Sequence, residues 1–212
     1  MKKTFFVIPA RKGSKGFPKK NRKLLPFTFN DIPKKNHEQV IVTTDDSYII
    51  KKLSSTKIKI LKREKKLSGD SISIKDVMLD VIKKFQIDPN DRIVMLYLTS
   101  PKRRFTDVEK ILTFYKRKKA KSLTCCVKPK SNPFLCFYQL KNNKGKQIIK
   151  HDLYRRQNYP ECFEMRHFVV IFDVNEILKL NKNLYNKNTI FYKIEDDIDV
   201  DYENDLKIIL NE

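Results

Sequence analysis

Short apolar runs alternate with longer amphipathic stretches along this chain, and that alternation limits the fold more than any other feature. Runs typical of buried strands lie at Thr4–Ile8, Val40–Thr44, Ile58–Leu61, Ile93–Leu98, Ser122–Val127, Phe168–Phe172 and Thr189–Ile194. Stretches typical of helices lie at Ser47–Leu53, Ile74–Phe85, Phe105–Lys118, Val174–Leu180 and Glu203–Leu210. Such alternation predicts βαβ units. We therefore predict the α/β class, with a single Rossmann-like domain over residues 1–212 and a mostly parallel sheet flanked by helices.

Two stretches depart from this alternation. Residues 25–38 include Pro26 and Pro33, which argue against a full helix there. Further along, a basic and polar turn at residues 141–146 separates two short apolar runs, which predicts a hairpin. We expect this hairpin to form a small insert over about residues 135–160, outside the main sheet.

The net charge of +21 raises the question of a nucleic-acid partner, because basic proteins are drawn to polyanions. Lysines are, however, abundant throughout the chain, including in places with no plausible ligand. A general lysine bias explains the charge more simply, so we do not expect specific nucleic-acid binding. The positive field would still attract an anionic nucleotide and an anionic co-substrate.

Composition also bears on the cellular compartment. No apolar run reaches the ~18 residues that a membrane span needs, and the basic N-terminus is not followed by the pattern of a signal peptide. The four cysteines show no CxxC spacing and are interpreted as free thiols. We expect a globular, cytoplasmic protein without a membrane partner.

A basic loop with two glycines follows the first predicted strand. Residues 8–21 read IPARKGSKGFPKKN and surround Gly13 and Gly16 with cations. Glycines let the backbone approach a ligand closely, and clustered cations suit a polyphosphate. The loop matches neither the P-loop nor the dinucleotide-binding pattern. Because this loop, Asp45 and the turn at residues 99–101 all follow predicted strands, we expect them at one ligand-binding edge of the sheet.

The order of residues Ala10-Arg11-x-x-Ser14-Lys15-Gly16-x-Pro18-x-Lys20-Asn21 resembles the opening signature of the acylneuraminate (CMP-sialic acid) cytidylyltransferase family. Further segments resemble the family in the same order, namely Val40–Asp45, Arg63–Asp70, Leu98–Arg103, Arg156–Pro160 and Asp199–Leu206. The six matches extend over nearly the whole chain. The resemblance implies a CTP-dependent nucleotidyltransferase that takes CTP and an acidic sugar as substrates.

On the nucleotide side, the resemblance implies that Arg11, Lys15 and Lys20 stabilise phosphate charge during catalysis. It implies nucleotide contacts from Ala10, Arg11, Ser14, Asn21, Arg63 and Ser73. The spacing at Ser73 is one residue short of the family pattern. Read without the family, the loop is a solvated basic turn before a helix, and Arg63 is a surface cation after a strand.

Asp199 and Asp201 lie two residues apart in an extended segment, so both carboxylates can face one cation. A few hard oxygen ligands suit magnesium, which retains waters and takes phosphate oxygens from its substrate. From spacing alone, an acidic turn ahead of the final helix is the better explanation, and Asp197 with Asp199 is a shifted alternative. The resemblance favours Asp199 and Asp201 as ligands of Mg²⁺ or Mn²⁺.

The departures from the family pattern lie where the family binds the sugar acid. Tyr97 stands where a glutamine is common, Leu135 replaces a lysine, and Arg166 and His167 replace small residues. By resemblance, the acceptor contacts are Tyr97, Thr99, Ser100, Arg156, Gln157 and Arg166. His167 is either a surface residue or an acceptor contact, and His151 is interpreted as a surface residue. We expect weak activity with N-acetylneuraminate itself.

The resemblance also implies that the insert reaches a second subunit, so we expect a homodimer. The leading hypothesis is a cytidylyltransferase that transfers CMP from CTP to an acidic sugar of the nonulosonic-acid type, releases pyrophosphate and supplies cell-surface glycan precursors. One alternative is a cytidylyltransferase for a different anionic acceptor. Another is a basic polyanion-binding protein on a degenerate enzyme scaffold.

Overall fold

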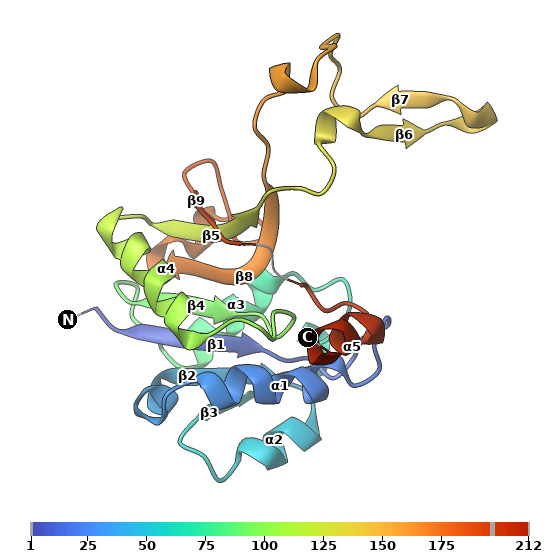
Figure 1. The fold of residues 1–212 in the computed structure, drawn as a ribbon. Helices are drawn as coiled ribbons and strands as arrows, with labels where there is room; N and C mark the ends of the chain where they lie inside the picture. Colours follow the sequence, from blue (N-terminus) through green and yellow to red (C-terminus); the bar gives the residue numbers. More distant parts are fainter. Residues whose placement is uncertain (1, 196–197, 212) are drawn as a thin grey trace.

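The computed structural model describes residues 2–195 and 198–211 of the chain. Within that part, seven strands form a central sheet in the order β3-β2-β1-β4-β8-β5-β9 (Figure 1). The strands are β1 (Thr4–Pro9), β2 (Val40–Thr44), β3 (Lys59–Lys62), β4 (Arg92–Leu96), β5 (Ser122–Val127), β8 (Glu164–Asp173) and β9 (Ile190–Lys193). β8 runs antiparallel to its neighbours β4 and β5, and the other neighbouring pairs are parallel. The predicted α/β fold with a mostly parallel sheet is confirmed.

Helices cover both faces of this sheet (Figure 1). One face packs against α1 (Lys20–Asp31), α2 (Ser47–Leu53), α4 (Phe105–Arg117) and α5 (Glu203–Asn211). The other packs against α3 (Ile74–Lys84) and η6 (Val174–Lys179), a 3₁₀ helix where the sequence predicts an α-helix. In β1, Phe6 and Ile8 point to the first face and Val7 to the second. Burial on both faces explains why these strands are continuous apolar runs.

The prediction that prolines prevent a full helix is wrong for the first part of residues 25–38. α1 is 12 residues long and contains Pro26, which has no N–H to donate within the helix. Leu24 and Leu25, in the same turn, are buried in the core. Burial stabilises each by about 1.5–3 kcal/mol, enough to offset the roughly 3 kcal/mol that an interior proline costs. The helix ends just before Pro33, which restricts the residue that precedes it.

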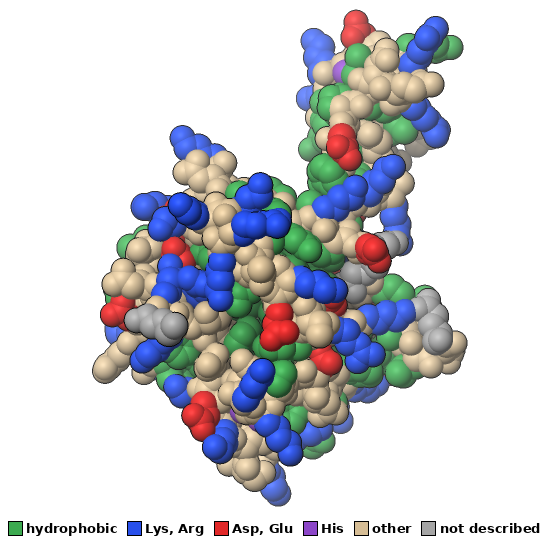
Figure 2. All heavy atoms as spheres, turned by 60° about the vertical axis from the view of Figure 1, so that its left-hand side comes forward, with side chains coloured by type: hydrophobic (Ala, Val, Ile, Leu, Met, Phe, Trp, Pro, Cys, Tyr) green, Lys and Arg blue, Asp and Glu red, His purple; other side chains and the backbone are tan. Residues whose placement is uncertain are grey.

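Charged side chains are spread over the surface. On the face drawn in Figure 2, Lys and Arg side chains lie over the whole body without gathering into one stripe. This distribution agrees with a lysine bias that acts on the entire chain. No helix within residues 2–195 and 198–211 is long and apolar enough to cross a bilayer.

Residues 128–163 form an arm that stands away from the sheet (Figure 1). The arm contains the predicted hairpin, in which β6 (Phe137–Gln139) pairs antiparallel with β7 (Gly145–Gln147). Its other elements are the 3₁₀ helices η3 (Pro133–Leu135), η4 (Lys141–Asn143) and η5 (Arg156–Asn158). The hairpin is confirmed, although its second strand begins earlier than the sequence predicts.

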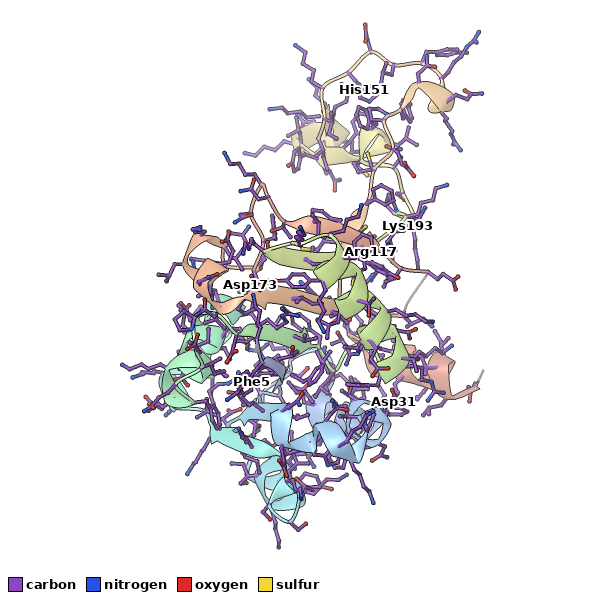
Figure 3. The ribbon with its side chains drawn as sticks, turned by 90° about the vertical axis from the view of Figure 1, so that its left-hand side faces the viewer. Phe5, Asp31, Arg117, His151, Asp173 and Lys193 are labelled. Atoms are coloured by element: carbon purple, nitrogen blue, oxygen red, sulfur yellow. The ribbon has the colours of Figure 1, made fainter. Side chains whose placement is uncertain are left out.

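A small cluster of rings packs together within the arm. Phe134 stacks on Tyr159 with ring centroids 5.7 Å apart, and the ring of His151 meets Tyr159 edge-on. His151 Nε2 donates a 2.7 Å hydrogen bond to the Phe134 carbonyl oxygen. Figure 3 places His151 in the arm, apart from the labelled residues of the body. The interpretation of His151 as a surface residue is wrong, because its ring is half-buried in this cluster.

Asp46 lies just past β2 and begins α2. Its buried carboxylate accepts hydrogen bonds from Arg22 at 2.6 and 2.9 Å and from the Tyr48 backbone N–H at 3.0 Å. Burial favours the neutral acid, but the hydrogen bonds from Arg22 and Tyr48 outweigh it and hold the pKa of Asp46 below its ordinary value. Asp46 therefore joins α1 to α2 at the edge where the parallel strands end.

Asp46→Asn keeps the size of the side chain but removes its charge, and we expect it to lower the free energy of unfolding at pH 7 by about 1–3 kcal/mol. Because the folded pKa of Asp46 is lowered, its carboxylate stabilises the fold above the unfolded pKa of ~3.9. That contribution is lost as pH falls through the folded pKa. The variant should therefore show a flatter acid limb in a plot of urea midpoint against pH.

The control is Glu38→Gln, which removes an exposed ion pair with Lys57 and should leave the urea midpoint nearly unchanged. Identical midpoints for the wild type and Asp46→Asn between pH 3 and 7 would contradict the stabilising role of the Asp46 carboxylate.

Candidate active site

Five of the eight nucleotide-side residues selected from the sequence line one cavity at the edge of the sheet where β1, β2 and β4 end, namely Arg11, Ser14, Lys20, Asn21 and Arg63. A cavity of about 280 Å³ lies at this edge. Its lining includes Arg11, Ser14, Lys20, Asn21, Arg63, Asp70, Tyr97 and Thr99. These residues come from the loop between β1 and α1, from the first turn of α1, and from the segments that follow β3 and β4. The carboxyl ends of parallel strands are the usual ligand-binding edge of such sheets.

Backbone contacts fix the basic loop that follows β1. Buried Ala10 donates its N–H to the Thr43 carbonyl oxygen at 2.9 Å, and the Lys12 N–H reaches Asp45 Oδ1 at 2.6 Å. The Asn21 side-chain amide donates to the Arg11 carbonyl oxygen at 2.8 Å. In this structure Asn21 thus positions the loop, and its predicted contact with the nucleotide stays a prediction.

Gly16 lets the loop approach the C-terminal part of the chain. A methyl group at this position would lie 3.1 Å from the Tyr202 ring and 3.2 Å from the Asp201 carbonyl oxygen. Both distances are closer than ordinary carbon contacts. The requirement for glycine here comes from this close approach, since no glycine among the described residues has a positive φ.

Asp70 pairs with two of the predicted phosphate-binding cations. Its Oδ1 lies 2.5 Å from Arg11 Nη1, and its Oδ2 lies 2.8 Å from Lys15 Nζ. The hydrogen bonds from Lys15 and Arg11 hold the pKa of Asp70 below its ordinary value, so the group is a carboxylate at neutral pH. Sequence reasoning did not select Asp70 as a site residue, and its only signal was its position at the end of the Arg63–Asp70 segment.

Arg63 is buried beneath the cavity rather than exposed after β3. Its Nη2 donates to the Thr43 carbonyl oxygen at 2.9 Å, and its Nε lies 3.3 Å from Thr43 Oγ1. Burial lowers the pKa of Arg63, and the charge of Asp45 opposes this shift. The alternative of a solvated surface cation is therefore wrong. A buried guanidinium that lines a cavity is a donor that a polar ligand can use.

Ser73 caps α3 instead of lining the cavity. Its Oγ accepts the Asp76 backbone N–H at 3.1 Å and donates to Asp76 Oδ2 at 2.6 Å. The residues on either side, Ile72 and Ile74, do line the cavity. The predicted base contact of Ser73 stays a prediction that this geometry does not support.

The segment around Val200 contacts two residues that line the cavity, Lys20 and Thr99. The Val200 N–H donates to the Thr99 carbonyl oxygen at 2.8 Å, and its side chain is fully buried. Lys20 Nζ lies 3.1 Å from the Val200 carbonyl oxygen and 3.0 Å from Asp201 Oδ1. Asp205 Oδ2 accepts the Asp201 N–H at 2.9 Å at the start of α5. Asp201 therefore faces the basic loop, while Asp205 caps a helix.

Asp199 has a carboxylate oxygen that fits a metal ligand. Its Oδ1 is buried and has no hydrogen-bond partner among the described residues. A buried carboxylate oxygen is costly unless a cation or donor satisfies it. Within residues 2–195 and 198–211, no three His, Cys, Asp or Glu side chains gather to hold a metal by themselves. Asp197, the shifted alternative, lies outside the described residues. Two carboxylates would suit an ion that takes its other ligands from phosphates and water.

On the acceptor side, Tyr97 stacks on His167 with ring centroids 4.6 Å apart and an interplanar angle of 27°. Burial, together with the charge of Asp199, raises the pKa of Tyr97, so its hydroxyl stays protonated. Burial lowers the pKa of His167, against the opposing charges of Asp199 and Asp201. His167 is therefore a half-buried partner of Tyr97 rather than a surface residue.

A bulge in β8 brings His167 into this stack. Thr124 of β5 pairs with Val170, but the next residue, Cys125, pairs with Arg166, so residues 167–169 face no residue of β5. Bulges re-aim side chains and are common beside active sites. The sequence showed apolar and β-branched residues here but nothing that marks an irregular register.

Arg103 joins the segment just after β4 to this bulge. We did not select Arg103 from the sequence as a site residue. Its Nη1 donates to the carbonyl oxygens of Tyr97 at 2.8 Å and Phe168 at 2.5 Å, and Nη2 lies 3.0 Å from Thr28 Oγ1. The guanidinium is buried in this position. The only signal for it was the arginine that ends the Leu98–Arg103 segment.

The remaining predicted acceptor residues are dispersed. Thr99 lines the cavity, and the buried Ser100 hydroxyl has no hydrogen-bond partner among the described residues. Arg166 Nη2 pairs with Glu164 at 3.2 Å. Arg156 and Gln157 are exposed on η5 of the arm, which Figure 1 shows projecting from the body. Arg156 and Gln157 therefore do not line the cavity of the same chain.

Comparison with known proteins places this geometry in context. Residues 5–212 match the family model of cytidylyltransferases. The chain is 27% identical to "Post-translational flagellin modification protein B" of Campylobacter coli, over 99% of this chain and 94% of that protein. It is 25% identical to the CMP-N,N'-diacetyllegionaminic acid synthase of Campylobacter jejuni, over 96% of this chain and 92% of that protein.

The N-acylneuraminate cytidylyltransferase of Streptococcus agalactiae is also 25% identical, over 96% of this chain, which spans only 51% of that longer relative. Among solved structures, a CMP:2-keto-3-deoxy-manno-octonic acid synthetase complexed with CTP superposes with a TM-score of 0.65 at 15% identity, covering 98% of this chain and 96% of the other. At that identity the likeness shows the fold alone. The family match, which covers nearly all of the chain, shows more: this protein belongs to the cytidylyltransferase family and is a CTP-dependent nucleotidyltransferase.

Proposed function

We propose that this protein transfers CMP from CTP to an acidic sugar of the nonulosonic-acid type, releases pyrophosphate and so supplies cell-surface glycan precursors in the cytoplasm. The observation that carries the proposal is the cavity lined by the basic loop after β1, whose Lys20 also pairs with Asp201. Relatives named for N-acylneuraminate and legionaminic acid support the acceptor class. The four cysteines are free thiols, as in proteins of reducing compartments.

In this reaction an acceptor hydroxyl oxygen forms a bond to the α-phosphorus of CTP as the bond from that phosphorus to the bridging oxygen breaks. Pyrophosphate leaves with the electron pair, and the hydroxyl proton passes to solvent. Arg11 and Lys15 would stabilise the negative charge that builds on the leaving phosphates. Ser14 lines the cavity and would add a hydroxyl donor. Lys20, held between the loop and Asp201, would stabilise charge nearer the α-phosphate.

Asp199 and Asp201 would hold the Mg²⁺ or Mn²⁺ ion. The buried Oδ1 of Asp199 has no hydrogen-bond partner within residues 2–195 and 198–211, which supports this assignment because a cation would satisfy it. When bound, the ion supplies positive charge that neutralises the phosphates during transfer. Asp201 would contribute a second carboxylate, which is paired with the cation Lys20 in this structure. Lys20 and Asp201 would thus place a positive and a negative charge side by side at the phosphate chain.

The acceptor would lie beside the stacked Tyr97 and His167 rings, next to the cavity. This wall replaces the amide and small residues of the family pattern with two aromatic rings. A site that loses hydrogen-bonding groups rejects its old substrate more strongly than one that changes only in size. For this reason we favour a nonulosonic acid other than N-acetylneuraminate as the acceptor.

The test is pyrophosphate release from each of CTP, ATP, GTP and UTP across a panel of 2-keto-3-deoxy sugar acids, with and without magnesium. We expect release only with CTP and a divalent ion, and at least tenfold faster with another nonulosonic acid than with N-acetylneuraminate. Efficient use of N-acetylneuraminate would contradict the acceptor assignment. No turnover with any acid, together with salt-sensitive binding to nucleic acid, would instead favour a polyanion-binding protein.

Asp201→Asn should lower kcat by about a hundredfold or more, because it removes a charged ligand without changing the size of the side chain. Glu203→Gln is a matched control. Both acidic residues pair with a lysine of α1, Asp201 with Lys20 at 3.0 Å and Glu203 with Lys23 at 2.6 Å. The control should keep kcat within about twofold of the wild type. Near-normal turnover of Asp201→Asn at limiting magnesium would mean that this segment is only an acidic turn before α5.

The arm would cross to a second copy of the chain. It exposes several large apolar side chains that its own subunit leaves uncovered: Leu135, Phe137, Tyr138, Leu140, Ile148 and Tyr154. Exposed apolar groups gathered on one element mark interaction surfaces. An arm placed across a partner would also deliver its exposed Arg156 and Gln157 to the partner's acceptor side.

Light scattering at micromolar concentration should give the mass of a homodimer. Tyr138→Asp with Tyr154→Asp places two charges on the arm, where these rings are 57% and 91% exposed, and should weaken the dimer at least tenfold. Leu210→Asp on α5, at a residue 62% exposed, is the control and should leave the mass unchanged. A monomeric wild-type protein would rule out a shared active site.

A further inference from the structure

Before any ligand is bound, two cations of the basic loop, Arg11 and Lys15, already have an anion between them. Asp70 accepts from Arg11 through one carboxylate oxygen and from Lys15 through the other, at 2.5 and 2.8 Å. Both Arg11 and Asp70 line the cavity. A carboxylate that bridges two cations at a cavity occupies the position that an incoming phosphate group needs.

Glu64 provides a comparison that separates the Asp70 arrangement from the ordinary ion pairs of a lysine-rich surface. Glu64 belongs to the same segment and also bridges two cations, Lys66 at 2.8 Å and Lys84 at 3.5 Å. The two carboxylates have similar exposure, 51% for Asp70 and 45% for Glu64. Neither Glu64 nor its partners line the cavity, whereas Asp70 and its partner Arg11 do.

We propose that Asp70 is an internal counter-anion, which Arg11 and Lys15 exchange for the phosphates of an incoming ligand and regain when pyrophosphate leaves. The inference rests on the proposed function for the identity of that ligand. Asp70 acts through the two cations, so it is a positioning residue that does not itself touch the reacting atoms. It holds the loop in place between turnovers, and it competes with every phosphate chain that enters.

Weak pairing is what makes such an exchange possible. Half-exposed ion pairs are screened by water and individually contribute little, so a polyphosphate with several negative charges can displace one carboxylate. The same competition would speed the departure of pyrophosphate, because the cations it leaves behind regain a partner at once. Removing the carboxylate charge should therefore strengthen polyphosphate binding, a direction that loss of a merely structural contact would not produce.

The test is calorimetric binding of inorganic pyrophosphate and tripolyphosphate, in chelator-treated buffer, to the wild type, Asp70→Asn and Glu64→Gln. Both variants add one unit of positive charge, but only Asp70→Asn removes the competing carboxylate from the cavity. We expect Asp70→Asn to bind both probes about three- to tenfold more tightly than the wild type, and Glu64→Gln to stay within about twofold. In turnover assays, Asp70→Asn should also show stronger inhibition by pyrophosphate.

Unchanged or weaker binding by Asp70→Asn would overturn the proposal, as would an equal gain in both variants or the absence of polyphosphate binding to all three proteins. Polyphosphate binding requires neither CTP selectivity nor an acceptor. A protein that fails to transfer CMP could still show the exchange, and a working cytidylyltransferase could lack it, so the two failures are distinguishable.

Discussion

Lys20 joins the basic loop to the segment before α5, beside the cavity that Lys20 itself lines. Its ammonium group donates to the Val200 carbonyl oxygen and to the Asp201 carboxylate, and Val200 in turn donates to the carbonyl oxygen of Thr99. The start of α1, the end of β4 and the segment before α5 therefore meet at one point, although they are far apart in the sequence. Without this junction the basic loop would have no acidic segment beside Lys20.

Two sets of ion pairs in this region differ in how deeply their carboxylates are buried. Arg22 pairs with Asp46, whose side chain is 1% exposed, whereas Arg11 and Lys15 share Asp70, which is 51% exposed. Removing one partner of a buried pair leaves an uncompensated charge in a poor solvent, so the Asp46 pair is structural. An exposed pair is screened and can be broken at little cost, so the Asp70 pair can give way to a ligand.

Periodicity in the sequence was enough to predict most of the fold but not its irregular parts. Three elements have the predicted bounds, namely Val40–Thr44, Ser47–Leu53 and Ser122–Val127. Each is a short apolar or amphipathic run that polar residues bound on both sides. The antiparallel direction of β8 could not be predicted, since apolar spacing carries no information about strand direction. The helix through Pro26 was missed because burial in the core, rather than local preference, decides that segment.

The candidate site divides in the same way. The order of residues in the basic loop was enough to predict two cations that line the cavity, Arg11 and Lys20. It could not predict that Asn21 would hold the loop backbone, that Ser73 would cap a helix or that Asp70 would bridge two cations. Those contacts depend on where separate segments meet in space. Arg103 shows the same limit, because Tyr97, Phe168 and Thr28, to which it donates, come from three separate segments of the chain.

The two halves of the site are consequently built by different physical means. On the nucleotide side, exposed ionic pairs can be exchanged for a ligand of the same charge. On the acceptor side, Tyr97 and His167 form a half-buried stack that Arg103 fixes through the backbone on either side of it. Arg103 thus fixes the backbone beside both rings of the stack. Under the proposed function, selectivity for the nucleotide would rest on charge and a few donors, and selectivity for the acceptor would rest on this stack, so substitutions could change the acceptor without disturbing the phosphate site.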